Sequence, residues 1–257
     1  DVEINGSVRG SVKIHAMGNI YIGGYVEDAD IWSGQDIIIQ DGVNAGENGR
    51  IEAMGNISAR FFENAHIISH SDIKCDYMLN TTALAYGGIY LEGKRGSVIG
   101  GDVTGVRGIC IKACGSESYS KTVLRVGVTK EISSEYAKVL MVLKDIDTQI
   151  DRFNQALQKL DILKKAGSDK FDETLNRKLL QSKIVKTAEK AKYEEKSRNL
   201  YTLVRESDRA VVRIDKNIYP GSRVFMGDKT YVPSTVFTHI ALKKTSQGVL
   251  IRNYDSM

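Results

Sequence analysis

The sequence is short of several residue types, and each shortage narrows what the protein can be. Only three cysteines occur among the 257 residues. They are odd in number and form no CxxC pair, which argues against a disulfide framework and favours a reducing compartment. No apolar run approaches the roughly 18 residues of a membrane-spanning helix, and no signal-peptide pattern opens the chain. We therefore expect a soluble, cytoplasmic protein.

Proline and glycine are unevenly distributed, and this divides the chain into three regions. Of the 24 glycines, 20 fall at or before Gly127, none lies between Gly127 and Gly167, and both prolines follow in the last region. The middle is rich in Lys, Glu, Leu and Ile, which is typical of helices. We predict a β-rich segment over 1–128, a helical insertion over 129–209, and return strands over 210–257.

A short alternation of apolar residues recurs in the first region at steps of 16 to 20 residues, usually with a glycine just before it. So small a unit cannot bury its apolar face alone, and stacking the units would stabilise them. The constant phase favours a parallel β-helix of roughly six coils over an antiparallel sandwich. Irregular steps favour a right-handed turn. The recurring pairs are Ile20/Ile22, Ile37/Ile39, Ile57/Ala59, Ile73/Cys75, Ile89/Leu91 and Ile109/Ile111.

The middle region has the alternating four- and three-residue spacing of a coiled-coil seam. Its members are Ile132, Tyr136, Val139, Leu143, Ile146, Ile150, Phe153, Leu157 and Leu160. Gly167 then predicts the end of a helix that starts at Glu131, and a second helix is expected to begin at Ser168 or Asp169. The predicted fold class is therefore mainly β, a right-handed parallel β-helix with a long antiparallel coiled-coil hairpin.

The returning helix has a less regular apolar pattern. It carries Phe171, Leu175, Leu179, Leu180, Ile184, Ala188, Ala191, Leu200 and Val204, and its seam is expected to contain smaller residues that accept the bulkier side chains of the first helix. Some apolar residues of the hairpin lie off the seams and form the candidate interaction surface: Leu140, Val142, Leu163 and Leu180. An uncovered apolar face invites a further helix, from a second copy of the chain or from another protein.

Charge is distributed differently on the two predicted helices. Between Arg177 and Arg198 there are eight basic and three acidic residues, whereas Glu131 to Asp161 has four basic and six acidic residues. Neutralisation across the seam explains this most simply. We therefore do not expect nucleic-acid binding or integral membrane insertion, while peripheral contact with an acidic lipid surface remains compatible with the sequence.

The sequence contains histidine, cysteine and acidic residues that could bind a metal ion or act in catalysis, but their spacing does not match a known metal or catalytic motif. His66 and His70 have no accompanying ligands at a zinc-like spacing, and Cys110 and Cys114 are better interpreted as core and turn residues. Five acidic residues lie on two neighbouring coils, which raises the alternative of a carbohydrate-active β-helix enzyme. Such a site also needs aromatic side chains that stack on the sugar, and the chain has a single tryptophan. These acids are Glu27, Asp28, Asp30, Asp36 and Asp41. We predict no catalytic residue, metal or cofactor.

Several segments, in order, resemble the flagellar assembly protein A family, and the resemblance extends from about Val2 to Arg252. They are Gly18-Asn19-Ile20, Gly55-Asn56-Ile57, Phe62-Glu63-Asn64-Ala65, Gly93-Lys94-Arg95-Gly96-Ser97-Val98-Ile99-Gly100-Gly101, Lys121-Thr122-Val123-Leu124-Arg125-Val126-Gly127 and Tyr219-Pro220-Gly221. The resemblance implies a β-helix of the bactofilin type with a coiled-coil region, and a bacterial, cytoplasmic, non-catalytic scaffold linked to flagellar assembly or polar organisation. Family members usually carry a further N-terminal domain, which the resemblance does not cover.

Overall fold

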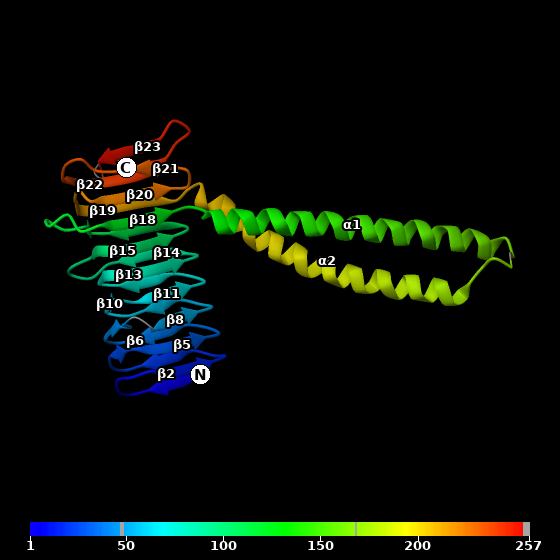
Figure 1. Cartoon of the computed structure of the whole chain (residues 1–257), viewed down its shortest axis with the longest axis horizontal. Coiled ribbons are helices and arrows are strands. Elements are labelled where there is room, and N and C mark those ends of the chain that lie inside the picture. The colour runs from blue at the N-terminus through cyan, green and yellow to red at the C-terminus, as the bar shows by residue number, and fades with distance from the viewer. Residues whose placement is uncertain (47–48, 168, 254–257) are drawn as a thin grey trace. The chain divides into compact units, whose positions relative to one another are not determined.

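The protein is a mainly β parallel solenoid of about six turns with two long helices, as seen in a computed structural model that describes residues 1–46, 49–167 and 169–253 (Figure 1). Contacts divide the chain into two compact units, residues 1–129 with 205–257, and residues 130–204. The solenoid unit comprises the strands and the second unit comprises most of the two helices.

The strands of the solenoid turns are short. They are β1 (Val2–Ile4), β2 (Val12–Ala16), β3 (Ile20–Ile22), β4 (Val26–Glu27), β5 (Ala29–Ser33), β6 (Ile37–Ile39), β7 (Gly42–Asn44), β8 (Arg50–Ala53), β9 (Ile57–Ser58), β10 (Phe61–Glu63), β11 (His66–Ser69), β12 (Ile73–Cys75), β13 (Tyr77–Ala85), β14 (Gly88–Leu91), β15 (Ser97–Gly105), β16 (Gly108–Ile111), β17 (Ala113–Cys114) and β18 (Thr122–Val126). After the helices come β19 (Val211–Ile218), β20 (Ser222–Met226), β21 (Lys229–Tyr231), β22 (Phe237–Lys244) and β23 (Val249–Asn253).

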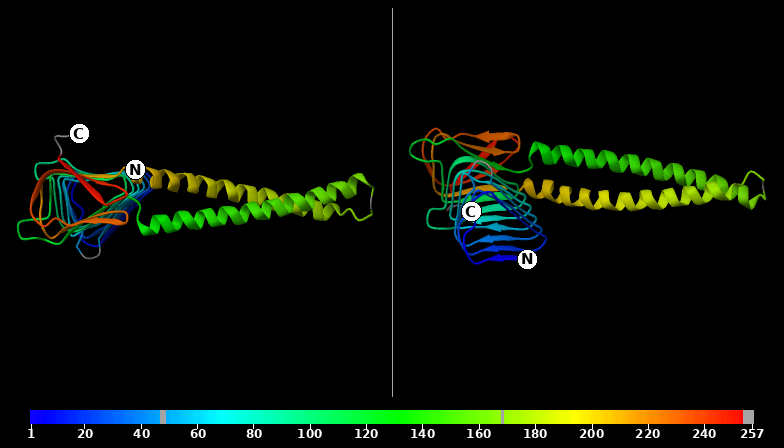
Figure 2. Two further views of the ribbon diagram at one scale, coloured as in Figure 1. Left: turned by 90° about the horizontal axis from the view of Figure 1, so that it is seen from above. Right: turned by 60° about the horizontal axis from the view of Figure 1, so that its bottom comes forward.

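The recurring apolar pairs stack into inward-facing ladders, as predicted. In one ladder β1, β3, β6, β9, β12, β14 and β16 pair in parallel, so that Ile20 lies beside Ile37 and Ile37 beside Ile57. All six predicted pairs are buried. Stacked turns are visible from two directions in Figure 2. The hydrophobic core is therefore a column of aliphatic side chains inside the coil.

A second ladder, made of polar groups, lies directly before these isoleucines. At five successive steps the Oδ1 atom of an Asp or Asn accepts a hydrogen bond from the backbone N–H of the equivalent residue one turn further on. The five donor–acceptor distances are 2.7 Å for Asn19 to Asp1, 3.1 Å for Asp36 to Asn19, 2.6 Å for Asn56 to Asp36, 3.2 Å for Asp72 to Asn56 and 2.7 Å for Gly88 to Asp72. We call this series the corner ladder.

The corner ladder explains the glycine before three of the apolar pairs, namely Gly18, Gly55 and Gly87. A Cβ atom on Gly55 would lie 2.1 Å from Asp36 Oδ1, and one on Gly87 would lie 2.1 Å from Asp72 Oδ1. Real Cβ atoms do not approach so closely, so the site must be glycine if the carboxylate of the previous turn is to reach its donor. The repeated Gly-Asn-Ile sequence thus encodes a space, an acceptor and a buried side chain.

The last part of the chain differs from the expected continuation of the coil. Strands β19 and β20 do return to the solenoid and pair in parallel with β16 and β18. Strands β21, β22 and β23 instead pair antiparallel, with β22 against β19 and β23 against β22. Antiparallel strands need only a tight turn, so the chain can reverse here without another full coil.

The two helices are α1 (Lys130–Lys165) and α2 (Glu173–Ser207). The prediction that the second helix begins at Ser168 or Asp169 is wrong for Asp169, which precedes the helix, and Ser168 lies outside the described residues. Asp172 caps the helix instead, because its Oδ1 atom accepts hydrogen bonds from the N–H groups of Thr174 and Leu175 at 2.8 and 3.0 Å.

Replacing Asp36 with alanine tests the corner ladder. Asp36→Ala leaves the Asn56 N–H without its acceptor, and we expect the free energy of unfolding to fall by about 1–2 kcal/mol. Urea unfolding followed by far-ultraviolet circular dichroism measures the change.

Asp36→Asn is the matched control, since asparagine occupies this position in the neighbouring turns and keeps an Oδ1 acceptor. We expect its stability to stay within about 0.5 kcal/mol of the wild type. An equal loss in both variants would show that the carboxylate charge, rather than the hydrogen bond, matters.

Candidate interaction surface

The seam of α1 packs as predicted. Ile132, Val139, Ile146 and Leu160 are at most 7% exposed, although they lie on a two-helix unit with few residues to cover them. The remaining seam residues, Tyr136, Leu143, Ile150, Phe153 and Leu157, are all half-buried. The predicted four- and three-residue spacing therefore identified the covered face of α1.

The prediction that small residues of α2 lie in its seam is wrong for Ala188 and Ala191. Leu175, Leu180, Ile184, Ala188 and Ala191 are exposed, and Ile184 keeps 68% of its surface in solvent. Another row, also spaced alternately by three and four residues, is buried or half-buried along its whole length. This inner row comprises Asn176, Leu179, Lys183, Lys186, Lys190, Tyr193, Ser197, Leu200 and Val204.

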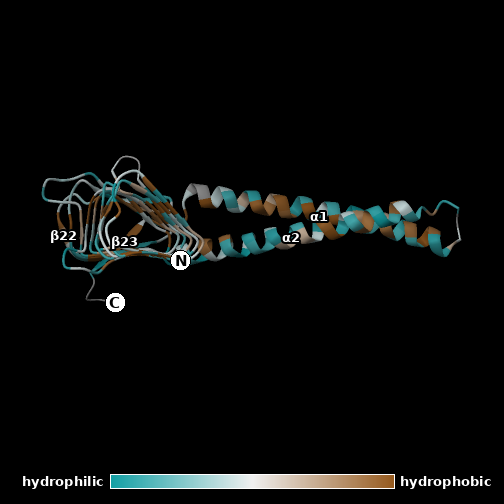
Figure 3. Ribbon diagram, turned by 90° about the horizontal axis from the view of Figure 1, so that it is seen from below, coloured by the Kyte–Doolittle hydropathy of each residue, from teal (hydrophilic) through white to brown (hydrophobic). Residues whose placement is uncertain are grey.

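The inner row was missed because five of its nine residues are polar. A search for regularly spaced apolar residues does not find polar ones. Lysine can nevertheless occupy such a position, since its aliphatic stem covers apolar surface while its ammonium group reaches the edge. A search for heptad spacing that also accepts lysine would have found the inner row. The signal is the regular spacing of Lys183, Lys186, Lys190, Tyr193 and Leu200. Polar and apolar residues are interspersed along both helices in Figure 3.

Ion pairs join the two helices at the edges of the covered faces. Lys190 Nζ lies 2.6 Å from Asp147 Oδ1, and Lys196 Nζ lies 2.6 Å from Glu135 Oε1. The hydrogen bond from each ammonium group to its carboxylate partner is the main cause that raises the pKa of Lys190 and of Lys196. These contacts agree with the expected neutralisation of the basic helix by the acidic one.

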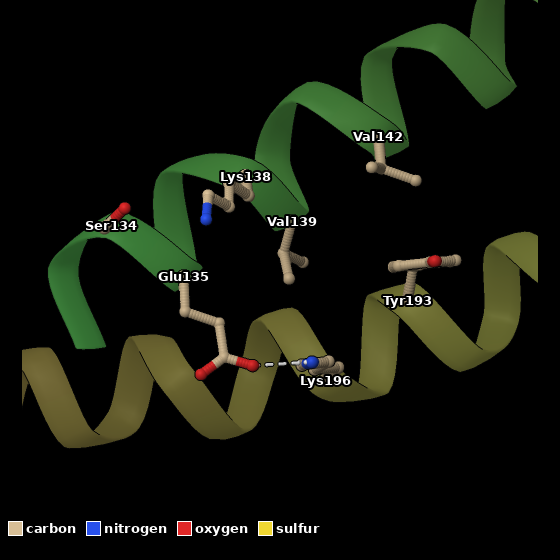
Figure 4. Close-up of a pocket in the computed structure, with 7 residues that line it drawn as sticks. All are labelled: Ser134, Glu135, Lys138, Val139, Val142, Tyr193 and Lys196. Atoms are coloured by element: carbon tan, nitrogen blue, oxygen red, sulfur yellow. Dashed lines mark ion pairs between the residues drawn. The ribbon is translucent and has the colours of Figure 1, made fainter. Parts of the chain in front are cut away.

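A groove of about 710 Å³ opens between the helices near the start of α1 (Figure 4). Val139 and Val142 of α1 and Tyr193 of α2 supply its apolar lining, while the Glu135–Lys196 ion pair lies across it. Val142, one of the predicted surface residues, is therefore half-buried in a groove and not on an open face.

The other three predicted surface residues lie in different places. Leu140 and Leu180 are 44% and 45% exposed, and Leu163 is half-buried. Val142 and Leu163 are 21 residues apart, three heptads, and so share one flank of α1, whereas Leu140 does not belong to that series. The four residues therefore lie at separate places: Val142 and Leu163 on one flank of α1, Leu140 elsewhere on α1, and Leu180 on α2.

The solenoid residues weighed for metal or redox chemistry have structural contacts. His70 stacks on Tyr86 with ring centroids 4.9 Å apart and lies 3.6 Å from Glu52, while His66 is exposed. Burial raises the pKa of Cys114 to about 12 and also raises the pKa of the half-buried Cys110. Within the described ranges, no three His, Cys, Asp or Glu side chains are arranged to bind a metal ion.

The acidic residues that raised the carbohydrate alternative are dispersed. Asp36 belongs to the corner ladder, Asp28 accepts a hydrogen bond from Ser11, and Asp41 lies 3.8 Å from Arg60. Asp30 is half-buried beside Lys13 in the strand register, and Glu27 is exposed. These contacts assign most of the five acids to turns and coil stacking.

An aromatic stack does lie on the solenoid surface near Glu63. Phe61 and Tyr77 stack with ring centroids 5.0 Å apart, Tyr77 donates a hydrogen bond to Glu63, and Arg95 covers the Tyr77 ring at 4.5 Å. A sugar needs an open ring face. Here the neighbouring ring and the guanidinium group already cover the faces of Tyr77, so the stack reinforces the coil.

Neither helix has, among its described residues, an apolar stretch long enough to cross a membrane. Comparison with protein families finds one matching model, described as the Flagellar Assembly Protein A beta solenoid domain, which matches residues 1–247. No curated protein and no solved structure matches the chain. The matched range contains both helices as well as the solenoid turns.

Lys183→Leu tests the inner row of α2. Leucine at this half-buried position removes an ammonium group that must reach solvent and adds apolar contact with α1, so we expect the free energy of unfolding of the helical unit to rise by about 1 kcal/mol. Thermal melting followed at 222 nm detects the change. Lys178→Leu is the matched control on the exposed side of α2, and an equal gain there would contradict the assignment of the inner row.

The reactivity of the three thiols tests the burial of the core. Burial keeps Cys75 and Cys114 protonated and covered, so we expect Ellman's reagent to modify Cys110 first in the folded protein and the other two only after unfolding. Mass spectrometry of the labelled peptides reports the order. Labelling of Cys114 in Cys110→Ser at the native Cys110 rate would contradict it.

Proposed function

The chain belongs to the flagellar assembly protein A β-solenoid family, and from that premise we propose that it is a non-catalytic scaffold in bacterial flagellar assembly or polar organisation. The match over residues 1–247 carries the proposal, because it includes the helical insertion as well as the repeat. A scaffold needs a rigid body and a surface for partners. The ladders of the solenoid supply the first, and the helical unit is proposed to supply the second.

The helical unit is proposed to act as an antiparallel coiled-coil hairpin that presents a partner-binding or self-association surface. Contacts between Glu135 near the start of α1 and Lys196 near the end of α2 support this arrangement, as does the heptad spacing of both covered faces. We further propose that the solenoid turn is right-handed, which the irregular steps of 16 to 20 residues favour.

A protein partner fits this unit better than a nucleic acid does. Part of the basic excess of α2 is already neutralised by Asp147 and Glu135 of α1, so it does not form an open cationic face. Exposed apolar side chains such as Leu140 and Leu180 are instead typical of helix-docking surfaces. A cytoplasmic location and, at most, peripheral membrane contact are part of the proposal.

We disfavour the carbohydrate-active alternative on two positive observations. Asp36 and Asp72 accept backbone N–H groups in the corner ladder, a structural task that occupies their Oδ1 atoms. The rings beside Glu63 use their faces in stacking on one another. Neither arrangement provides a carboxylate pair beside an open aromatic platform, which glycoside cleavage requires.

The role in flagellar assembly is tested by genetic complementation in the bacterium that encodes the protein. We expect a deletion strain to lose or misplace flagella, counted by electron microscopy, and the full wild-type chain to restore them. Leu140→Glu combined with Leu163→Glu places charge at two of the candidate surface positions of α1 and should restore few or none.

The matched control is Gln155→Glu combined with Gln158→Glu, which adds the same charge to exposed polar positions of α1 and should restore flagella fully. Circular dichroism of each purified chain checks that helicity is retained. Normal flagella in the deletion strain would refute the assembly role, and full rescue by the leucine variant would exclude Leu140 and Leu163 of α1 from the partner surface.

A further inference from the structure

The exposed side of α2 carries a second heptad row that the fold leaves uncovered. Residues at alternating steps of four and three, all of them exposed, form this outer row: Arg177, Gln181, Ile184, Ala188, Ala191, Glu195 and Arg198. Leu180 flanks it and is 45% exposed. An apolar heptad row marks the face along which one helix packs against another, and the centre of the outer row, Ile184, Ala188 and Ala191, is apolar. Helix α1 already lies against the inner row, so the outer row is free for a further helix.

The outer row is complementary to its own inverted copy. When two α2 helices lie antiparallel about a two-fold axis level with residue 186, Ile184 meets Ala188 of the other helix and Gln181 meets Ala191. On each side of this centre Arg177 meets Glu195, and Arg198 lies beyond that contact, level with Thr174. Large side chains thus oppose small ones in the middle, and opposite charges meet on both sides of it.

Parallel pairing of the same row lacks these features. It would place Arg177 beside Arg177 and Glu195 beside Glu195 of the second copy, and like charges in contact are unfavourable. The row therefore selects an antiparallel neighbour and excludes the parallel one. This is the form of charge pattern that sets orientation in coiled coils.

The charged residues on both sides are available for such contacts. Arg177 Nη2 lies 3.9 Å from Glu173 Oε1 within α2, close to the upper limit of an ion pair, and both side chains are about four-fifths exposed. An exposed pair of this length contributes little to stability. Re-pairing Arg177 with Glu195 of a second copy therefore loses little inside the monomer.

We propose that the protein forms a two-fold homodimer through the outer row of α2, packed antiparallel against the outer row of a second copy. This inference rests on the proposed function, because it names a second copy as one partner of the helical unit. The dimer joins two solenoids through a bundle that contains both helical units. The side chains at the centre of the dimer contact are few, and most are small. The dimer is therefore expected to dissociate at low protein concentration.

Charge reversal with the full chain tests the dimer. Sedimentation equilibrium of the wild type should show a mass that rises with concentration towards twice the 28.4 kDa of the chain. Arg177→Glu and Glu195→Arg each create two like-charge contacts per dimer and should each weaken self-association roughly tenfold or more. An equimolar mixture of the two variants should regain the dimer mass, since every contact is then between opposite charges.

Two further variants complete the design. Lys178→Glu makes the same charge change one residue from Arg177 but off the outer row, and it should leave the dimer intact. The double variant Arg177→Glu with Glu195→Arg restores opposite charges within one sequence and should dimerise like the wild type, which also controls for folding.

The proposal is overturned if the wild type stays at 28.4 kDa at every concentration, or if Lys178→Glu weakens the dimer as much as Arg177→Glu. It is also overturned if the mixture and the double variant both stay monomeric. A monomeric wild type that still restores flagella leaves the scaffold role standing with a different partner, so the two proposals fail separately.

Discussion

Everything in the solenoid depends on contact between one turn and the next. Apolar ladders supply most of the driving force. The corner ladder is directional. Each Oδ1 acceptor meets one particular N–H of the following turn, which fixes the register and places the next isoleucine inside.

This constraint also accounts for what the solenoid tolerates. Strand β16 pairs with β19 and β18 with β20 in the same parallel manner as earlier turns, although two helices intervene in the sequence. The stack can therefore resume after a long insertion, because both ends of the insertion return to register. The family match spans the stack and the insertion together.

The solenoid turns could be predicted from the sequence because the pattern repeats. A turn with a weak pattern is identified by the turns before and after it. The seam of α1 was equally clear, since all nine of its residues are apolar. The inner row of α2 could not be recognised in the same way. Lys183, Lys186 and Lys190 are half-buried through their aliphatic stems, although their ammonium groups are charged. The antiparallel strands β21 to β23 and the cap at Asp172 occur once each, so no repeat identifies them. The candidate surface residues stay a prediction, because the exposure of a helical residue depends on which neighbour is present.

The pairing of β18 with β20 has a consequence for the order of folding. Thr122 and Ser222 lie side by side yet are 100 residues apart in the sequence. Closing so long a flexible segment is entropically costly and slow. Helices, however, form within about a microsecond from local contacts. If α1 and α2 pair first, as the Glu135–Lys196 contact allows, the effective segment shortens to a few tens of residues, and closure becomes easier by about 1 kcal/mol. The insertion that interrupts the coil thus helps the chain to resume it.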